Sequence, residues 1–579
     1  MCKENMKANT SPVSIHIFEN SSEQVRYAAS ELRHYLGLMT GEIYEITETV
    51  TENQISLILD PQLAADEFDI SSSDKKLTIR GGERGVIYGA YELLETLGCR
   101  FFTATSELVP HVSKLALPDI NTHQKPVFEY RDLNYYESTK YSRFAVKSRL
   151  NGACRGVKEK HGGNMTYAWF VHSFQAMVDP NIYGKDHPEY FAMYDGVRVT
   201  KRDKNQLCLT NPEVLEIAVE STRKALLAHP KANIISLSQN DWDRGCECPA
   251  CRASDLAEGS PAGTLLKFVN AIAERLEPEF PNVIFDTLAY NYTRPIPTSA
   301  TRARHNVCVR LCSIEACFSH SFETCNDDRS VRLPDGSRSD FITDLRNWGK
   351  VCNRVYIWDY TTCFAHYPAP HPNWNVLAPN MQSFANNNVK GVFEQACGAS
   401  AGSTDFNELR EYIISKLLWN PWTDVDRHIC EFTDYFYGDA APYVREYIKY
   451  VCKVAEDENI HVGFNDNLES PLFRDEVLDT LQGFINKAKA AVASDPLRLW
   501  RIGKAELSVR WVRLKRKAQM EDGFDSEETN RFFTDWRAYG MTRIDEWCSQ
   551  ETTFRAMLQG LWRGTEFYSH WSGDGPEEL

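Results

Sequence analysis

Polar side chains stand directly after several apolar stretches of the sequence, where a buried strand is expected to end. The clearest example is SLSQND, residues 236–241, in which the apolar run stops at Gln239 and is followed by Asn240 and Asp241. Comparable positions after other apolar runs hold Arg131, Asp132, Asn134, His172, Tyr290, Asn291, Glu315, Trp358, Asp359 and Glu394. Carboxylates, amides and imidazoles bind hydroxyl groups, and aromatic rings stack on C–H faces, so this mixture suits a sugar.

The elements that would bring these side chains together are short strands that alternate with helices over residues 123–423. The expected strands are FEYRDLN, MTYAWFVHSF, EYFAM extending toward NQLCLT, NIISLSQND, VIFDTLAYNY, VCVRLCSIEA, VYIWDYTT and VKGVFEQAC. This series of strand–helix units favours a (β/α)8 TIM barrel, in which the carboxyl ends of all strands open into one cavity. An open doubly wound sheet is the alternative, but no glycine-rich phosphate motif follows the first strand.

Two further domains flank the expected barrel. Residues 13–122 alternate strand and helix patterns and predict a small α/β domain, with Ser22 as the cap of its first helix and Gly41 as the end of that helix. Residues 424–579 carry long amphipathic stretches and predict an α-helical C-terminal domain. The expected fold class is therefore α/β, and residues 1–12 are expected to be a flexible tether.

Composition limits the classes of partner. The formal net charge of -16 leaves no counterion-release gain on nucleic acid, so nucleic acid and anionic membrane surfaces are not expected as main partners. No stretch of about 20 apolar residues is present, and no transmembrane span is expected. Cys2, followed by a polar segment, is typical of a processed bacterial lipoprotein, although an ordinary N-terminus can have the same composition. We therefore expect an extracytoplasmic protein, at the cell surface or in the periplasm, with a lipid anchor at Cys2 as one alternative.

One cysteine motif needs separate weighing. Cys246, Cys248 and Cys251 give the pattern C-x-C-x-x-C, which could supply three thiolates to zinc. A closed structural site needs a fourth ligand, however, and no second cluster of Cys or His is adjacent. A disulfide or a set of packed thiols that stiffens the loop after Asp241 explains the motif at least as well. We expect neither a metal nor a cofactor. The sequence also lacks the motifs of phosphate loops, serine hydrolases and zincins.

Each strand-end residue also has a purely structural interpretation. A single Asp or Asn after a strand is often a helix cap or a turn former. Glu315 and Glu394 could form buried ion pairs with Arg131 or Arg310, and His172 taken alone is compatible with a core histidine. The functional interpretation therefore depends on the collective placement of these side chains at strand ends.

Several motifs resemble those of known families. RGVIYGAYELLETLGCRFF resembles the small domain that precedes the barrel in bacterial α-glucuronidases and β-hexosaminidases. HPEYFAM, SLSQNDWDRGCECPAC, YIWDYTTCF and VKGVFEQAC together resemble the barrel of domain of unknown function 4838, now glycoside hydrolase family 163. The resemblance extends over roughly the first three quarters of the chain.

This resemblance implies an endo-β-N-acetylglucosaminidase that cuts the chitobiose core of complex N-glycans, with an N-linked glycan or glycoprotein as substrate. It also implies a retaining mechanism in which the acetamido group of the substrate replaces the enzyme nucleophile. One group must then orient the acetamide, and another must protonate the leaving oxygen. By their position in related hexosaminidases, Asn240 would orient the acetamide and Asp241 would donate the proton.

Other assignments stay open. Glu315 or Glu394 could be the acid, because an Asn cannot balance the positive charge of the intermediate and the acid of such pairs is more often Glu. The pKa of the acid must be raised by apolar surroundings or a like charge. Arg131 and Asp132 are expected to bind sugar hydroxyls. An exo-acting α-glucuronidase on plant xylan and a non-catalytic glycan-binding protein are the alternative functions.

Overall fold

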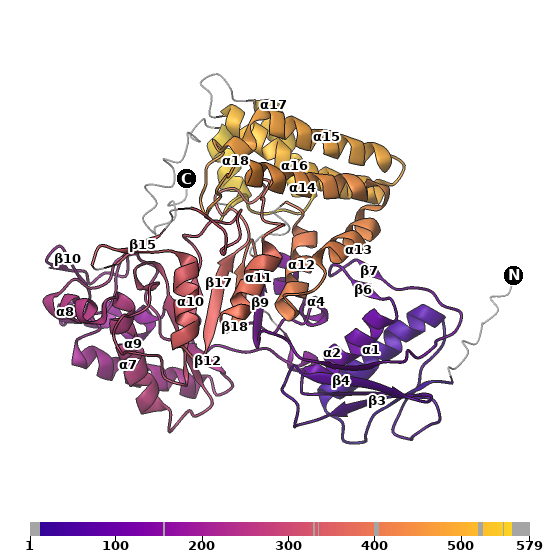
Figure 1. Ribbon diagram of the computed structural model, residues 1–579, viewed down its shortest axis with the longest axis horizontal. Coiled ribbons are helices and arrows are strands. Elements are labelled where there is room, and N and C mark those ends of the chain that lie inside the picture. Colours follow the sequence, from indigo (N-terminus) through magenta and orange to yellow (C-terminus); the bar gives the residue numbers. More distant parts are fainter. Residues whose placement is uncertain are drawn as a thin grey trace. The chain divides into compact units, whose positions relative to one another are not determined.

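The computed structural model describes residues 12–153, 157–327, 330–333, 335–398, 405–518, 525–547 and 549–558. The chain forms two compact units, which are described separately (Figure 1). Unit 1 comprises residues 1–164 and 408–436, and unit 2 comprises residues 165–407 and 437–579. Residues 408–436 thus belong to the same unit as the first 164 residues, whereas the sequence analysis expected domains that are continuous along the chain. Cys2 and the expected tether, apart from Pro12, lie outside the described residues.

Unit 1 contains a six-stranded sheet in the order β2-β1-β3-β5-β4-β8. β1, β2, β3 and β5 are parallel, whereas β4 is antiparallel to both β5 and β8. The strands are β1 (Ser14–His16), β2 (Ile46–Thr47), β3 (Gln54–Leu59), β4 (Phe68–Ser73), β5 (Lys76–Gly81) and β8 (Asn121–Gln124). Helices α1 (Glu23–Thr40) and α2 (Gly85–Thr96) pack on this sheet and on each other, as the sequence predicts for a small α/β domain.

The ends of these two helices follow from single residues. The Ser22 side chain accepts the N–H of Val25 at the start of α1, and Gly41 ends the helix with a φ of 73°. Both ends agree with the sequence prediction. Gly85 opens α2 where a Cβ atom would lie 2.0 Å from the carbonyl oxygen of Glu67. Only glycine allows this close approach of the start of α2 to the residue that precedes β4.

The rest of unit 1 consists of short elements and two returning helices. They are β6 (Arg100–Phe101), β7 (Glu107–Leu108), β9 (Tyr130–Asn134), α3 (Tyr136–Lys140), α4 (Ser142–Lys147), and most of α12 (Asn407–Trp419) and α13 (Val425–Tyr437). Trp419 of α12 stacks on Phe68 with ring centroids 6.1 Å apart and meets the Tyr88 ring edge-on at 5.6 Å. Aromatic packing thus holds α12 in the core of unit 1.

Unit 2 contains a parallel sheet in which β12, β13, β14, β17 and β18 follow one another. The strands are β12 (Ile234–Ser236), β13 (Ile284–Ala289), β14 (Val307–Cys312), β17 (Val355–Tyr360) and β18 (Val389–Gln395). The helices that alternate with them or precede them are α5 (Phe174–Met177), α6 (Pro180–Tyr183), α7 (Pro212–Ala228), α8 (Pro249–Glu258), α9 (Pro261–Leu276), α10 (Phe341–Val351) and α11 (Leu377–Asn386). The strands are almost fully buried, as expected for a parallel sheet with covered faces.

The complete eight-stranded barrel expected from the sequence is not confirmed, since the parallel sheet curls as a half-barrel. Within the described residues, the expected strand MTYAWFVHSF contributes one bridge, between Tyr167 and Ile234. The expected strand EYFAM is broken up: Pro188–Tyr190 form a short 3-10 helix, Phe191 bridges Leu207, and Met193 begins the hairpin of β10 (Met193–Tyr194) and β11 (Val197–Arg198). Asp195 and Gly196 have φ values of 50° and 83°, and an Asp-Gly pair with positive φ favours such a tight local hairpin.

The C-terminal part of unit 2 is helical, as predicted. Its helices are α14 (Ala441–Asp457), α15 (Asp475–Ala491), α16 (Pro496–Ala518), α17 (Ser526–Ala538) and α18 (Gln550–Leu558). α14 packs on α15, α15 on α16 and α16 on α17. In the part of the chain that the structure describes, none of the helices has the length and apolar character needed to cross a membrane.

Candidate active site

A cavity of about 490 Å³ lies at the carboxyl ends of the parallel strands in unit 2. Its polar lining consists of His172, Asp241, Tyr290, Gln395, Arg543 and Glu546. Its remaining lining consists of Leu288, Cys312, Ile314, Trp358, Tyr360, Phe464 and Trp547. Binding sites of parallel α/β folds form at this end of the strands, so this cavity is the candidate active site.

Strand alternation explains why these side chains face the cavity. Successive side chains of a strand point to opposite faces of the sheet, and residues two apart share a face. The cavity accordingly receives the pairs Leu288 and Tyr290, Cys312 and Ile314, and Trp358 and Tyr360. Four residues expected from the sequence, His172, Asp241, Tyr290 and Trp358, are thereby brought together.

Asp241 lies exposed in the cavity lining and accepts a hydrogen bond from the Tyr290 hydroxyl, with 3.0 Å between the oxygen atoms. Burial, and next the charge of Asp241, raises the pKa of Tyr290 well above its usual value. The phenol therefore stays protonated and remains a donor at physiological pH. The carboxylate of Asp241 is oriented by this bond and still has lone pairs for a ligand.

His172 is held by two bonds to the end of β12. Its N–H donates to the Ser238 hydroxyl oxygen and its ring Nδ1 donates to the Gln239 carbonyl oxygen, each over 2.9 Å. Because a carbonyl oxygen only accepts, the Nδ1 atom carries a proton, and Nε2 is the ring nitrogen left for a ligand. The backbone has a φ of 55° at His172, a conformation that is uncommon outside glycine.

Asn240 does not line the cavity. Its side-chain amide donates to the carbonyl oxygen of Asn205 over 2.7 Å and accepts the N–H of Gln175 over 3.3 Å. Its own N–H and carbonyl group bind the side chain of Gln206 over 2.9 Å each. The residue therefore fixes the loop that presents Asp241. The sequence-based expectation was that Asn240 would orient the acetamido group of the substrate.

The cavity wall also contains residues that sequence reasoning missed. Arg543, Glu546 and Trp547 come from the segment between α17 and α18, and Phe464 comes from the segment after α14. Burial raises the pKa of Glu546, even though the Tyr367 hydroxyl donates to its carboxylate and Arg543 lies near. The cluster of charged and aromatic residues in RIDEW, between two helices, is the signal that could have indicated this segment.

Glu315 follows β14 but forms an ion pair outside the cavity lining. The buried Arg294 donates to its carboxylate over 2.9 Å and to Asp344 over 2.8 Å. The sequence interpretation of Glu315 as an ion-paired residue thus agrees with its placement, although the partner is Arg294. Asn291 begins the short turn Asn291–Thr293 with a φ of 49° and is likewise absent from the cavity lining.

Asp359 and Glu394 lie side by side on β17 and β18, facing away from the cavity. They line a separate void of about 10 Å³ together with residues of α11. Burial raises the pKa of Asp359 to about 6, and its carboxylate accepts the Ser313 hydroxyl. Burial and then the charge of Asp359 raise the pKa of Glu394 well above its usual value. Both oxygens of the Glu394 side chain are buried without a hydrogen-bond partner among the described residues.

We expect Glu394→Gln to stabilise unit 2 progressively more as pH rises from 5 to 9. A carboxyl with a raised pKa in the folded state favours folding most at low pH, and stability is lost as pH rises through that pKa. A glutamine side chain has the same shape without the charge, so this loss disappears. Thermal unfolding midpoints over this pH range measure the effect, with the exposed Glu469→Gln as control. Parallel pH profiles for wild type and Glu394→Gln would contradict the expectation.

Below the cavity, a buried ion pair forms the floor of the site. Arg310 of β14 and Asp286 of β13 are both fully buried, with 3.1 Å between guanidinium nitrogen and carboxylate oxygen. The guanidinium lies against the rings of Tyr167, Phe170, Tyr356 and Trp358, at 5.5 to 6.0 Å from the ring centroids. Trp358 also donates from its indole N–H to Gln395 over 2.6 Å. The floor is therefore a rigid layer of aromatic rings around one paired charge.

The three expected site residues of β9 lie in unit 1. Arg131 is fully buried and donates to the carbonyl oxygens of Phe128 and Arg149 over 2.8 Å each. Its guanidinium lies 5.3 Å from the centroid of the Trp419 ring. Asp132 is equally buried and accepts the Tyr130 hydroxyl over 2.7 Å, and Asn134 ends the strand half-buried. The placement of Arg131 and Asp132 argues for a role in the core of unit 1, in place of the expected contact with sugar hydroxyls.

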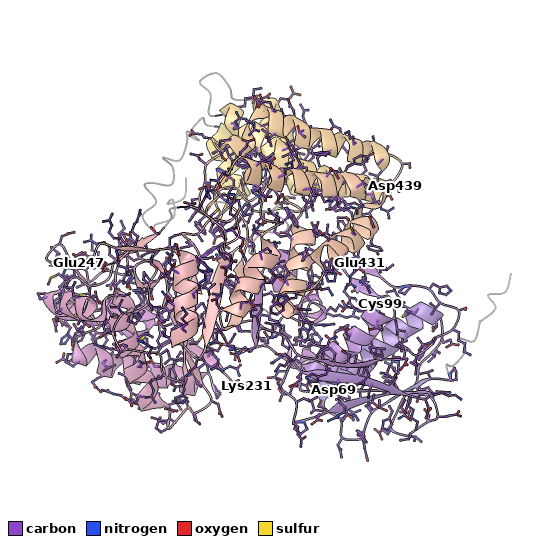
Figure 2. All side chains as sticks on the ribbon, in the orientation of Figure 1. Asp69, Cys99, Lys231, Glu247, Glu431 and Asp439 are labelled. Atoms are coloured by element: carbon purple, nitrogen blue, oxygen red, sulfur yellow. The ribbon has the colours of Figure 1, made fainter. Side chains whose placement is uncertain are left out.

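The cysteine motif has a fourth thiol beside it. Cys208 lies with Cys246, Cys248 and Cys251 in one buried cluster, so the sequence argument that no further ligand is near is wrong. Glu247, between two of these cysteines, marks the place of the cluster next to β10 and α8 (Figure 2). Its N–H donates to the carbonyl oxygen of Met193 in β10 over 2.9 Å.

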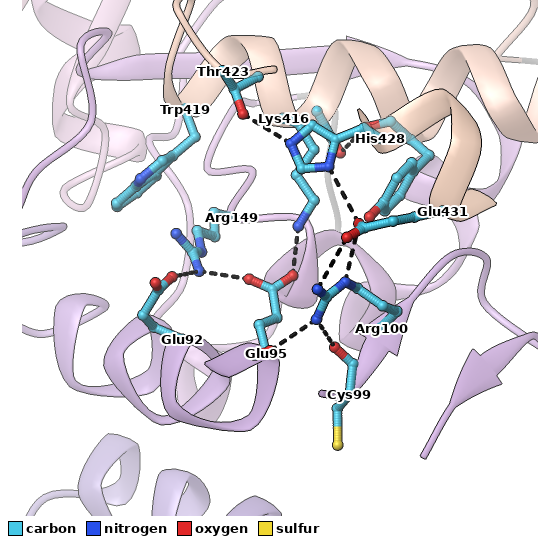
Figure 3. A network of polar contacts seen from close by, with 12 residues as sticks. Glu92, Glu95, Cys99, Arg100, Arg149, Lys416, Trp419, Thr423, His428 and Glu431 are labelled. Atoms are coloured by element: carbon cyan, nitrogen blue, oxygen red, sulfur yellow. Dashed lines mark hydrogen bonds and ion pairs between the residues drawn. The ribbon is translucent and has the colours of Figure 1, made fainter. Parts of the chain in front are cut away.

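A second cavity, of about 440 Å³, lies in unit 1 and is lined by paired charges. Figure 3 shows Arg149 between Glu92 and Glu95, and Arg100 on Glu431. Burial alone would raise the pKa of Glu95, but Lys416 and Arg149 lower it to about 2. Lys416 joins α12 to Glu95 of α2, and Arg100 joins β6 to Glu431 of α13, so the charged groups of this cavity are paired with one another.

Three solved structures that resemble this chain are glycoside hydrolases. A family GH115 4-O-methyl-α-glucuronidase with specificity for decorated arabinogalactans has a TM-score of 0.58 at 13% identity, covering 96% of this chain and 78% of that chain. A GH138 enzyme targeting pectin rhamnogalacturonan II scores 0.45 at 12% identity, covering 91% of each chain. A GH20 exo-β-N-acetylglucosaminidase from Vibrio harveyi scores 0.42 at 10% identity, covering 74% of each chain. The first likeness, at a TM-score of 0.58, shows a fold shared with a glycoside hydrolase.

The family follows from the sequence itself. Residues 101–449 match the family described as Domain of unknown function (DUF4838). Since the match spans more than half of the chain, this protein belongs to the DUF4838 family, as the resemblance of its motifs predicts. Its assignment to glycoside hydrolase family 163 stays a prediction. No curated protein matches the chain.

Proposed function

We propose that this protein is a glycoside hydrolase, and more narrowly an endo-β-N-acetylglucosaminidase that cuts the chitobiose core of complex N-glycans. The observation that supports the proposal is the cavity of unit 2, which combines two carboxyl groups with the rings of Trp358, Tyr360, Phe464 and Trp547. Aromatic rings beside carboxyl groups provide both the stacking surface and the proton transfer that a glycosidic bond needs. The fold shared with a glycoside hydrolase adds support.

The proposed reaction uses the acetamido group of the substrate as nucleophile. Its carbonyl oxygen attacks the anomeric carbon, the glycosidic bond breaks, and the leaving oxygen takes a proton from an acid of the protein. Water then opens the cyclic intermediate with retention of configuration. The protein must supply an acid that is protonated near neutral pH and a group that orients the acetamide and balances its developing positive charge.

Glu546 and Asp241 suit these two tasks, although the sequence-based assignment made Asp241 the proton donor. Glu546 is partly buried and its pKa is raised, as a general acid requires. Asp241 is exposed in the cavity lining, and the hydrogen bond from Tyr290 orients its side chain so that it can accept a second donor. We therefore assign proton donation to Glu546, and orientation of the acetamide N–H to Asp241. Asn240, which was expected to orient the acetamide, instead holds the loop of Asp241 in place from outside the cavity.

A screen of two substrates tests the function. An N-glycopeptide should yield an intact free oligosaccharide and a peptide that keeps one N-acetylglucosamine, both read by mass. Aldouronic acid should be left unchanged. Release of single monosaccharides from the non-reducing end, with the core uncut, would overturn the endo assignment, and turnover of neither substrate would favour the glycan-binding alternative.

One observation favours a second candidate, an exo-acting α-glucuronidase. A uronate needs a cation in the site, and Arg543 supplies a guanidinium to the cavity lining. The structure with a TM-score of 0.58 is itself described as a 4-O-methyl-α-glucuronidase. Arg543 also donates to the carbonyl oxygen of Glu546 over 2.6 Å, which identifies a structural task for it. Release of glucuronic acid from aldouronic acid in the same screen would decide for this candidate.

A further inference from the structure

Four buried cysteines of unit 2 come from two separate parts of the sequence. Cys246 and Cys248 belong to the loop after β12, and Cys251 belongs to the first turn of α8. Cys208 lies before α7 and joins them in space. All four are less than a tenth exposed, at 3 to 7%. Cysteine is often buried simply as an apolar residue, so the argument depends on how the sulfur atoms are arranged.

The sulfur atoms stand at the distances of a metal coordination sphere. Cys208 Sγ lies 3.7 Å from Cys248 Sγ and 3.8 Å from Cys251 Sγ, and all four atoms lie within 4.8 Å of one another. Four sulfurs bound to zinc at about 2.3 Å form a tetrahedron with edges of about 3.8 Å. A disulfide would instead bring two sulfurs to about 2.05 Å and leave the others aside. We propose that Cys208, Cys246, Cys248 and Cys251 bind one Zn²⁺ ion in a closed site.

The surroundings of the sulfurs fit thiolates. The Met193 N–H points to Cys246 Sγ over 3.4 Å and the Cys251 N–H to Cys248 Sγ over 3.5 Å. The guanidinium of Arg198 lies 3.7 Å from Cys246 Sγ. Backbone donors and a cation stabilise the charge that four thiolates keep when they share one divalent ion. Soft thiolate ligands in tetrahedral arrangement select zinc over the hard cations magnesium and calcium.

The zinc site has a structural task next to the candidate active site. Four thiolates complete the tetrahedron and leave no position for a substrate or water. Cys246 lies five residues after Asp241, and Gln206, two residues before Cys208, donates to the carbonyl oxygens of Asn240 and Trp242. The ion thus clamps the loop that carries Asp241 to the segment before α7.

A second cluster of potential metal ligands in unit 2, made of other residues, independently indicates a zinc site. Cys317 Sγ lies 3.4 Å from His320 Nδ1 and 3.3 Å from His461 Nδ1, and Cys325 Sγ lies 3.7 Å from His461 Nδ1. All four ligand atoms lie within 4.8 Å of one another. A tetrahedral zinc with two sulfurs and two nitrogens has S···N distances of about 3.6 Å. This Cys₂His₂ set therefore forms a second zinc site.

The second site ties the loop after β14 to the segment that follows α14. The Phe318 N–H donates to the Val462 carbonyl oxygen over 2.8 Å, and Ser319 donates to the Ile460 carbonyl oxygen over 2.7 Å. Phe464, two residues beyond Val462, is part of the cavity wall. Zinc at His461 would fix this wall, as the first site fixes the loop of Asp241.

Elemental analysis of the full-length protein, purified without chelators, tests both sites separately. We expect two zinc ions per chain in wild type and in Cys352→Ser, which changes a buried cysteine outside both clusters. Cys208→Ser and His461→Ala should each retain one. Zinc contents near zero in wild type would overturn the proposal, and iron in place of zinc would overturn the choice of metal. An unchanged content in either variant would remove the corresponding site.

A spectroscopic arm covers the case in which a variant fails to fold. Wild type produced in medium with cobalt in place of zinc should show sulfur-to-cobalt charge-transfer bands and the intense visible bands of tetrahedral Co²⁺. These signals depend on thiolate ligation and not on catalytic activity, so they stay informative if the proposed glycosidase reaction is wrong. Their absence from folded, cobalt-treated protein would contradict both sites.

Discussion

Glu546→Gln should lower turnover of a natural N-glycan by about 10²–10⁴-fold, the usual contribution of general acid catalysis. The natural leaving group is a sugar oxygen, which departs poorly without a proton. The same variant should keep much more of its activity on an aryl glycoside, whose leaving group needs little protonation. Initial rates on both substrates, for wild type and variant, measure this dependence on the leaving group. Since Gln has the shape of Glu, the change removes the proton and keeps the packing against Tyr367.

Asp241→Asn is the matched comparison for this prediction. If Asp241 orients the acetamide, activity should fall on both substrates alike, because the interaction is made whichever group leaves. The reverse pattern, with leaving-group dependence in Asp241→Asn and a uniform loss in Glu546→Gln, would restore the sequence-based assignment of Asp241 as the acid. Leaving-group dependence in Glu394→Gln alone would contradict both assignments.

The pH dependence of kcat/KM is a second test of the same variants. A general acid with a raised pKa keeps its proton at higher pH, so kcat/KM of wild type should fall on the alkaline side as Glu546 ionises. In Glu546→Gln that alkaline limb should vanish along with most of the rate. In Asp241→Asn it should remain.

Arg310→Leu should destabilise unit 2 by about 3–5 kcal/mol, the cost of leaving one partner of a buried ion pair uncompensated. Asp286 and Arg310 are fully buried and burial raises the pKa of Asp286, so the isolated carboxylate has no route to water. Chemical denaturation followed by tryptophan fluorescence measures the loss, because Trp358 lies against the guanidinium.

A double-mutant cycle separates the ion pair from simple packing. Asp286→Asn combined with Arg310→Leu removes both charges and should recover most of the stability that Arg310→Leu loses. If the double variant is as unstable as the sum of the two single variants, the guanidinium contributes through ring contacts alone and the prediction fails.

The positions of the strands of unit 2, and part of the site, were predictable from the sequence. Buried parallel strands leave continuous apolar runs, and the polar residue that ends such a run lies at the edge where the cavity forms. Asp241, Tyr290, Trp358 and His172 were found in this way. This rule does not say to which face of the sheet the side chain of a strand-end residue points, and a shift by one position along the strand reverses the face. Asp359 and Glu394 end their strands, yet they point away from the cavity.

Long-range contributions could not be predicted from local pattern. Glu546 and Trp547 lie about 300 residues after Asp241 in a segment with no strand to mark it. Cys208 stands alone in the sequence, so the fourth thiol became visible only when folding placed it beside C-x-C-x-x-C. The expected strand EYFAM fails for a different reason, because the Asp195-Gly196 turn pairs Met193 and Tyr194 with the nearby β11.

Because residues 408–436 belong to unit 1, this unit can complete its core only late in the synthesis of the chain. Unit 1 begins with the first 164 residues, but its core is completed by Trp419, which is made only after the whole first segment of unit 2, residues 165–407. At typical ribosomal speeds this delay is on the order of tens of seconds. During that time the rings of Phe68 and Tyr88 lack their partner on the nascent chain. The core of unit 1 therefore stays incomplete until Trp419 is made, and slower translation between the two segments should lengthen this period.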